Sequence, residues 1–341
     1  MTSDTTVQLP RFRSDDDAAA TTAATTAAAA AGLGAVSVVL GYLILRHYLY
    51  VEWLISPPIP VLWWAVAGVA SALGLPLLLA VLGRDAERLV ALSWPALAVR
   101  WVLPFLGFHL LWVAADLVVL RRFAGGSATV VVRDTQELLM TMALPPAELS
   151  LLYCLALAPL VAKLTRRLPT WAVLGGFAVV VVVTGGSAPA VGLLFLLAGL
   201  RLRVPLDRLA AAASWPRLAL LAGALLAVVG GSAALGTIVP DGIRLVVAGA
   251  AAVPFGVTAA ALVGRRLLAV AGRSAVLSCV LLVPVTALVD DVVLPRLSTA
   301  GRLVQLAAAV GEPMVLTAGI VAGALVVTAA GNRLRRKVGA R

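Results

Sequence analysis

The sequence predicts an all-α protein, a polytopic bundle of transmembrane helices. Of its 341 residues, 62% are hydrophobic and only 13% are charged, whereas about 25% of the residues of a soluble domain are charged. Mean hydropathy is +1.04. Apolar runs long enough to cross a hydrocarbon core of about 30 Å recur along the chain. These observations exclude a soluble enzyme and a disordered chain.

The first segment, residues 1–29, differs from the rest in composition. Asp15, Asp16 and Asp17 precede a low-complexity tract of alanine and threonine. Such a tract offers few large side chains to bury and no turn residues. We therefore predict a disordered cytosolic tail that leads into the first helix.

The helix bundle is expected over residues 30–332, followed by a basic cytosolic tail at residues 333–341. About ten segments are long and apolar enough to span a bilayer. They are residues 31–50, 60–82, 98–120, 148–164, 171–186, 187–200, 218–237, 245–263, 275–289 and 311–331. The fifth and sixth are the weakest, because residues 171–200 form one uncharged run that turn residues 184–189 interrupt. We interpret this run as a tight helical hairpin, and nine or eleven spans remain open.

The distribution of basic residues predicts the orientation. With both termini in the cytosol, 20 of the 27 Lys and Arg residues lie in cytosolic segments and seven lie outside. The positive-inside rule favours this arrangement in a cytoplasmic membrane. The same scatter of single and paired charges argues against a nucleic-acid partner, which requires one basic face.

Motifs of soluble catalysis and of metal binding are missing from the sequence. It has no phosphate-binding Gly-rich loop followed by Lys, no nucleophile elbow and no paired histidines. Cys154 and Cys279 both fall in apolar runs, so we predict buried thiols and neither a disulfide nor a metal site.

The third span carries the candidate catalytic residues, His109 and Asp116. Together with Trp112 they are spaced three and four residues apart, so they share one helical face. One interpretation is a polar face that lines a cavity, with His109 suited to proton transfer. The other is that both side chains are tied to neighbouring helices, with Asp116 pairing Arg121 or Arg122.

Other polar groups near the spans have simpler interpretations. His47 closes the first span at the outer headgroup level, and Glu312 precedes Pro313 where we expect the last span to start. An acidic residue suits a helix start because of the helix dipole.

Three arginines form the candidate donor-binding group. Arg84 and Arg88 are one turn apart, and Arg100 lies at the mouth of the third span. Such a cluster could hold the phosphates of an activated donor. Asp85 and Glu87 weaken it, and a plain positive-inside loop is the alternative.

The order of these features resembles the acyltransferase-3 family of membrane O-acyltransferases. Residues 34–42 resemble the family's first helix, and Arg100 followed by Leu103-Pro104-Phe105 is similar to its arginine and proline element. Residues 149–169, ending in Arg166-Arg167-Leu168-Pro169, and residues 272–284 resemble two later segments. The resemblance touches most of residues 31–332.

The departures concern the family's functional positions. Tyr42 stands where the first helix of the family ends in a histidine thought to act as base. Ala96 stands where a further arginine is expected, and Leu282 stands where the late histidine is expected. The catalytic set of the family is therefore degenerate here.

The resemblance implies an integral membrane enzyme that moves an acyl group from a cytosolic thioester, with acyl-CoA as co-substrate, to a hydroxyl of an envelope glycan or lipid. His109 would then be the replacement base, and Arg84, Arg88 and Arg100 would hold the donor. No bound cofactor is expected, and membrane lipid is the expected surrounding. The alternative is a catalytically degenerate scaffold, or a transporter of lipids or small molecules, on the same fold.

Overall fold

The structure is a computed structural model of the whole chain. It describes residues 13–50, 59–84, 90–115, 150–236, 238–263, 265–292 and 301–339, with residues 86 and 296. Of these described residues, 89% are helical and none forms a strand. The all-α prediction is therefore confirmed for this part of the chain.

The described residues form helices of very different length. They are α1 (Arg13–Arg46), η1 (Tyr48–Tyr50), α2 (Ile59–Arg84), α4 (Trp94–Leu97), the π-helical turn η2 (Ala98–Val102), α5 (Leu103–Ala115), α8 (Ser150–Leu164), α9 (Thr170–Val183), α10 (Ala188–Arg201), α11 (Arg203–Ala211), α12 (Trp215–Ala234), α13 (Asp241–Leu262), α14 (Arg265–Gly272), α15 (Ala275–Val292) and α17 (Arg302–Gly339). Each of the ten predicted spans overlaps at least one of these helices.

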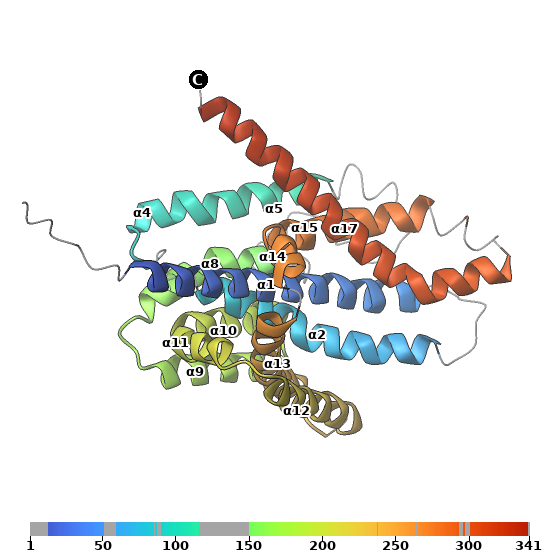
Figure 1. Cartoon of the computed structure of the whole chain (residues 1–341), viewed down its shortest axis with the longest axis horizontal. Coiled ribbons are helices and arrows are strands. Elements are labelled where there is room, and N and C mark those ends of the chain that lie inside the picture. The colour runs from blue at the N-terminus through green and yellow to red at the C-terminus, as the bar shows by residue number, and fades with distance from the viewer. Residues whose placement is uncertain are drawn as a thin grey trace, which may run out of the picture.

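Helices α1 and α2 run side by side through the middle of the bundle (Figure 1). α1 also packs against α14 and α13, and α2 packs against α10. The first half of α17 contacts α1 and α15, whereas its C-terminal half extends away from the bundle in Figure 1. The main core lies where α1, α2, α10 and α13 meet.

Several of the helices are apolar and long enough to cross a membrane. Within the described residues these are α1 from Thr21, α2, α12, α13 and α17, and α10 with α11 could make a sixth crossing if that bent pair counts as one span. α8 and α9 are apolar but shorter. The chain is therefore a multi-pass helical membrane protein.

The N-terminal segment differs from the prediction of a disordered tail. α1 begins at Arg13, so residues 13–29 are helical, and Thr26 and Ala29 are buried. Alanine has the highest helix propensity, and the hydroxyl of Thr25 bonds back to the carbonyl of Thr21 at 2.8 Å. Small side chains do bury surface here, because they allow α2 and α14 to approach the backbone of α1.

Glycines set the closest of these helix crossings. A Cβ at Gly32 of α1 would collide with the backbone carbonyl of Leu268 in α14, and one at Gly272 would collide with that of Ala28. α2 and α10 cross in the same reciprocal way through Gly83 and Gly199. Such pairs let helix backbones touch, which is how small residues drive packing in membranes.

The predicted hairpin within residues 171–200 is confirmed. α9 ends at Val183 and α10 begins at Ala188. Gly185 and Gly186 have φ angles of +64° and +82°. Their amides bond to the carbonyls of Val182 and Val181 at 3.2 and 2.8 Å, the two bonds of a Schellman cap.

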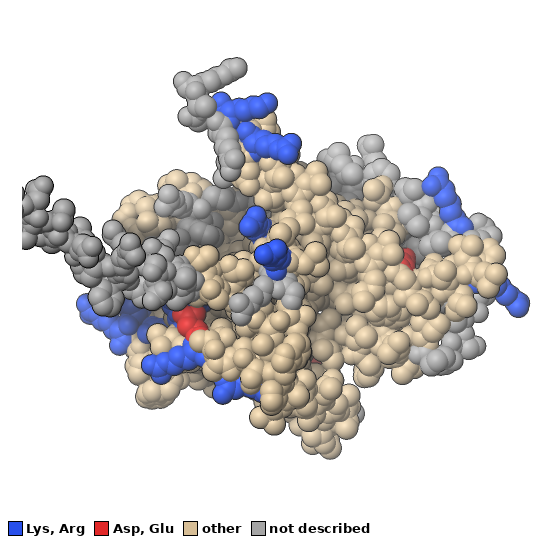
Figure 2. All heavy atoms as spheres, viewed as in Figure 1, with Lys and Arg blue, Asp and Glu red and all other residues tan. Residues whose placement is uncertain are grey.

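Charged side chains are unevenly spread over the surface. On the face shown in Figure 2, Lys and Arg gather near the two ends of the bundle, over α14 and at the free end of α17. Uncharged side chains cover most of the remaining face.

Candidate functional site

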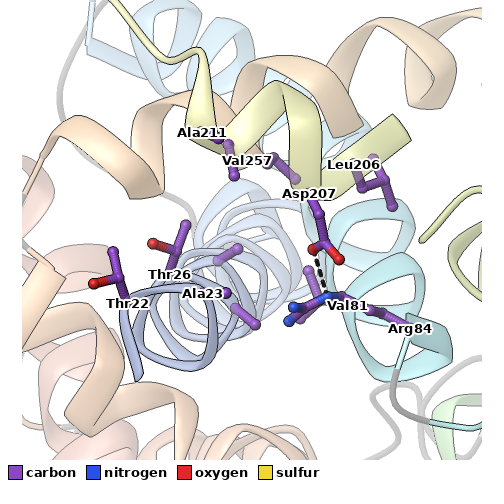
Figure 3. Close-up of a pocket in the computed structure, with 12 residues that line it drawn as sticks. Thr22, Ala23, Thr26, Val81, Arg84, Leu206, Asp207, Ala211 and Val257 are labelled. Carbon is purple, nitrogen blue, oxygen red and sulfur yellow. Dashed lines mark ion pairs between the residues drawn. The ribbon is translucent and has the colours of Figure 1, made fainter. Parts of the chain in front are cut away.

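Arg84, the first of the predicted donor-binding residues, is the last residue of α2 and is paired with a carboxylate. Its Nε lies 2.8 Å from Oδ1 of Asp207 in α11, as Figure 3 shows. Arg203, one turn earlier in α11, has its Nε 3.9 Å from Oδ2 of the same side chain. A bend of 73° between α10 and α11 carries Asp207 to the end of α2.

A cavity of about 330 Å³ adjoins this ion pair. The view in Figure 3 shows it between α1, α2, α11 and α13, with Arg84 and Asp207 on one side and the threonines of α1 on the other. Apart from these polar groups its wall is made of alanine, valine and leucine. The lining residues are Thr22, Ala23, Thr26, Ala27, Ala30, Val81, Arg84, Leu206, Asp207, Ala210, Ala211 and Val257. This is the composition expected for a small amphipathic ligand.

The structure does not describe the side chains of the other two donor-binding candidates, Arg88 and Arg100. Arg88 lies outside the described residues, and Arg100 lies in η2 with its side chain outside the described set. The three-arginine cluster is therefore not assembled from described side chains. The carboxylate next to Arg84 comes from Asp207 on a distant element, whereas the sequence had pointed to its neighbours Asp85 and Glu87, which also lie outside the described residues.

His109 lies in α5 with 1% of its surface exposed. Its ring centroid is 5.7 Å from that of Phe105, which in turn is 5.7 Å from Tyr153 of α8. Neither ring nitrogen has a hydrogen-bond partner among the described residues. Asp116 and the side chain of Trp112 lie outside the described set.

A second polar site, which the sequence did not predict, joins the first and last helices. Nε2 of His47 lies 2.9 Å from Oε1 of Glu312, and both side chains are buried. His47 directly follows the last residue of α1. Its side chain is buried against Glu312 of α17 and is not, as the sequence had predicted, exposed at the end of the helix. Glu312 lies inside α17, which begins at Arg302, so the expected helix start at Glu312 is wrong.

A proline explains why this part of α17 binds its neighbours. Pro313 has no amide hydrogen, so the carbonyl of Ala309, four residues earlier, loses its partner within the helix. The indole Nε1 of Trp63 in α2 donates to that carbonyl at 3.0 Å. Tyr48 packs edge-on against Trp63, with ring centroids 6.1 Å apart. We call His47, Tyr48, Trp63 and Glu312 the outer cluster, and the cavity with Arg84 and Asp207 the inner cavity.

One signal for the outer cluster was present in the sequence. Glu312 is the only acidic residue after Asp291, and it stands within an apolar run beside a proline. An acid in that setting requires a partner inside the protein. Its position 265 residues after His47 explains why sequence spacing did not connect them.

Cys154 and Cys279 are free and buried, as predicted. Among the described residues, no group of three or more His, Cys, Asp or Glu side chains is placed to hold a metal ion.

No family model, no curated protein and no solved structure matches this chain. Its function is therefore inferred from its own side chains.

Proposed function

We propose that this chain crosses the cytoplasmic membrane ten times, with both termini in the cytosol. Five described helices, or six with the bent pair α10–α11, are long and apolar enough to cross a membrane, and each remaining predicted span overlaps a described helix. The positions of the 27 basic residues support the orientation. Cysteines introduced at Ser56 and Ala86 should be labelled from opposite sides of the membrane. Labelling of both from the same side would contradict this topology.

We further propose that the chain is an O-acyltransferase whose general base is His47. The donor is a cytosolic thioester such as acyl-CoA, and the acceptor is a hydroxyl of an envelope glycan or lipid. The observation that carries this proposal is the buried hydrogen bond between His47 and Glu312. A histidine positioned by a carboxylate is the arrangement that hydrolases and transferases use to activate a hydroxyl.

The chemistry needs no metal. In the proposed reaction the imidazole of His47, oriented by Glu312 at its Nε2, accepts the proton of the acceptor hydroxyl. The hydroxyl oxygen attacks the thioester carbonyl, a C–O bond forms, and the C–S bond breaks. The proton then passes from His47 to the departing thiolate, giving an ester and a free thiol. Glu312 orients the ring and stabilises the imidazolium formed between the two transfers.

This proposal moves the role of base from His109 to His47. The acyltransferase-3 resemblance puts the family's histidine at Tyr42, whereas His47 lies five residues later and directly follows α1. His109 remains the competing candidate because it is the only other histidine in the chain, with Asp116 as its companion on the same helical face. Its aromatic surroundings offer no described carboxylate to orient the ring.

The test is acyl-group profiling of the envelope in a deletion strain complemented with variants. We expect His47→Gln to abolish the acyl modification, because a glutamine amide can still donate to Glu312 but cannot act as base. His109→Gln is the matched control and should retain it. Loss in His109→Gln with retention in His47→Gln would return the role to His109. Equal membrane levels of both variants exclude a folding defect.

The inner cavity supports a second candidate, a non-catalytic transporter or scaffold that binds lipids or small molecules. Arg84 and Trp63 lie on α2 about 30 Å apart at 1.5 Å per residue, so the cavity and the outer cluster are at opposite ends of the bundle. A deletion strain with an unchanged acyl profile would favour this candidate.

A further inference from the structure

The inner cavity combines features of a ligand site that the acyl-transfer chemistry at His47 does not use. Its volume of about 330 Å³ lies within the range of about 300–1,000 Å³ typical of small-molecule sites. Apolar side chains from four helices make most of its wall, and its polar groups are Arg84, Asp207 and two threonines. This distribution matches a ligand with one charged end and one apolar end.

The two charged side chains of the inner cavity differ in their exposure to solvent. The side chain of Arg84 is 13% exposed, whereas that of Asp207 is 40% exposed. A poorly solvated guanidinium requires an anionic partner. Moving the carboxylate of Asp207 fully into water costs less free energy than moving the guanidinium of Arg84, because Asp207 is already partly solvated. Arg203, one turn away at 3.9 Å, remains as its partner. Asp207 can therefore leave Arg84 if another anion takes its place.

The element that carries Asp207 is weakly attached. α11 has no fully buried residue and follows a 73° bend after α10. It nevertheless supplies Leu206, Asp207, Ala210 and Ala211 to the cavity wall. A small shift of α11 would open the cavity at the edge of the core, because α11 contributes only partly buried side chains to it, whereas α1, α2, α10 and α13 supply most of its buried residues.

We propose that the inner cavity binds an amphiphile with a phosphate group and an apolar tail. The phosphate replaces Asp207 at Arg84, since arginine binds phosphate oxygens with two parallel hydrogen bonds. The tail lies against Ala27, Val81 and Val257, and the hydroxyls of Thr22 and Thr26 border it. The phosphate can belong to an anionic lipid or to a thioester donor, and the inference holds whether or not the protein transfers acyl groups.

Native mass spectrometry of the purified full chain tests the proposal with two probes, palmitoyl-CoA and phosphatidylglycerol, against phosphatidylcholine as reference. We expect Arg84→Gln to weaken binding at least about tenfold, the size of one lost charge-assisted hydrogen bond. Asp207→Asn removes the competing anion and should strengthen binding several-fold. Arg208→Gln is the matched control, because Arg208 lies on the same helix, is exposed and does not line the cavity, and it should change binding less than about twofold.

A steric variant separates occupancy of the cavity from simple surface charge. Ala210→Phe fills the half-exposed wall without changing any charge and should abolish binding. Binding of palmitoyl-CoA alone identifies a thioester donor, binding of phosphatidylglycerol alone identifies a lipid, and binding of both identifies the shared phosphate and tail. Binding of neither probe overturns the proposal, and so does weaker binding in Asp207→Asn. The acyl profile of His47→Gln is a separate measurement, so failure of one proposal does not decide the other.

Discussion

The two ends of the bundle each join an acidic to a basic side chain from distant helices, but they do so in different surroundings. His47 and Glu312 have side chains 2% and 7% exposed, and their pair joins α1 to α17. Arg84 and Asp207 are 13% and 40% exposed and border a cavity. The first pair has no water to replace a lost partner, whereas the second has both water and Arg203. Burial therefore makes the outer cluster a fixed element, and exposure makes the inner pair exchangeable.

Removal of Glu312 should give the largest loss of stability. Glu312→Ala leaves the Nε2–H of the buried His47 imidazole without its acceptor, which costs about 1–3 kcal/mol, and it also removes the buried methylenes of Glu312, so the two losses add. Denaturation in mixed micelles should show a loss of this size. Glu312→Gln keeps the shape and one hydrogen bond and should cost clearly less. Equal losses in the two variants would show that the pair contributes packing and not polarity.

A change at the inner end of the scaffold should have an intermediate effect. A Cβ at Gly199 collides with the backbone of Ala80 in α2, so Gly199→Val forces the two helices apart and should cost about 1–3 kcal/mol. Gly323→Val in α17 is the control, because nothing lies within 4 Å of a Cβ placed there. A control as unstable as the test variant would contradict the assignment of this crossing as a tight contact.

Loss of the indole donor at the outer end should have a smaller effect. Trp63→Phe keeps most of the ring packed on Tyr48 but removes the hydrogen bond to Ala309, which Pro313 leaves without a helical partner. A buried carbonyl without its donor costs about 1–3 kcal/mol. Pro313→Ala restores the helical amide for Ala309, so in that background Trp63→Phe should cost less. An unchanged cost would show that the proline does not create the need for Trp63.

The sequence predicted the fold better than the sites, for a physical reason. Each apolar run longer than the hydrocarbon core becomes a helix because lipid leaves backbone groups no other partner. The hairpin at Thr184–Ser187 follows from local glycines in the same way. Pairing between side chains is not local. Glu312 and Asp207 find their partners through the packing of helices that lie far apart in the chain, and no spacing rule contains that information.

The prediction of disorder for the alanine-rich segment before residue 30 was wrong from Arg13 onward, for a related reason. Low complexity predicted disorder because alanine buries little area by itself. In this bundle, however, Ala29 and Ala30 are buried in the main core, and Gly272 of α14 packs against the backbone of the neighbouring Ala28. How much surface a small residue buries depends on the helix that packs opposite it, and local composition does not identify that helix.

The smallest effect on stability is expected at the exchangeable pair itself. Asp207→Asn removes the charge that faces Arg84, but the asparagine amide oxygen can still accept a hydrogen bond from that guanidinium. The side chain at position 207 is also 40% exposed, and ion pairs with exposed members contribute only about 0–1 kcal/mol. We therefore expect a change in unfolding free energy below about 1 kcal/mol, measured in the same micelles as Glu312→Ala. Raising the salt concentration should shrink even this difference, because screening acts on solvent-exposed charges. The Glu312→Ala loss should stay constant with salt, since that pair is closed to ions. A salt-independent loss of several kcal/mol in Asp207→Asn would show that the inner pair is as fixed as the outer one and is not available to a ligand.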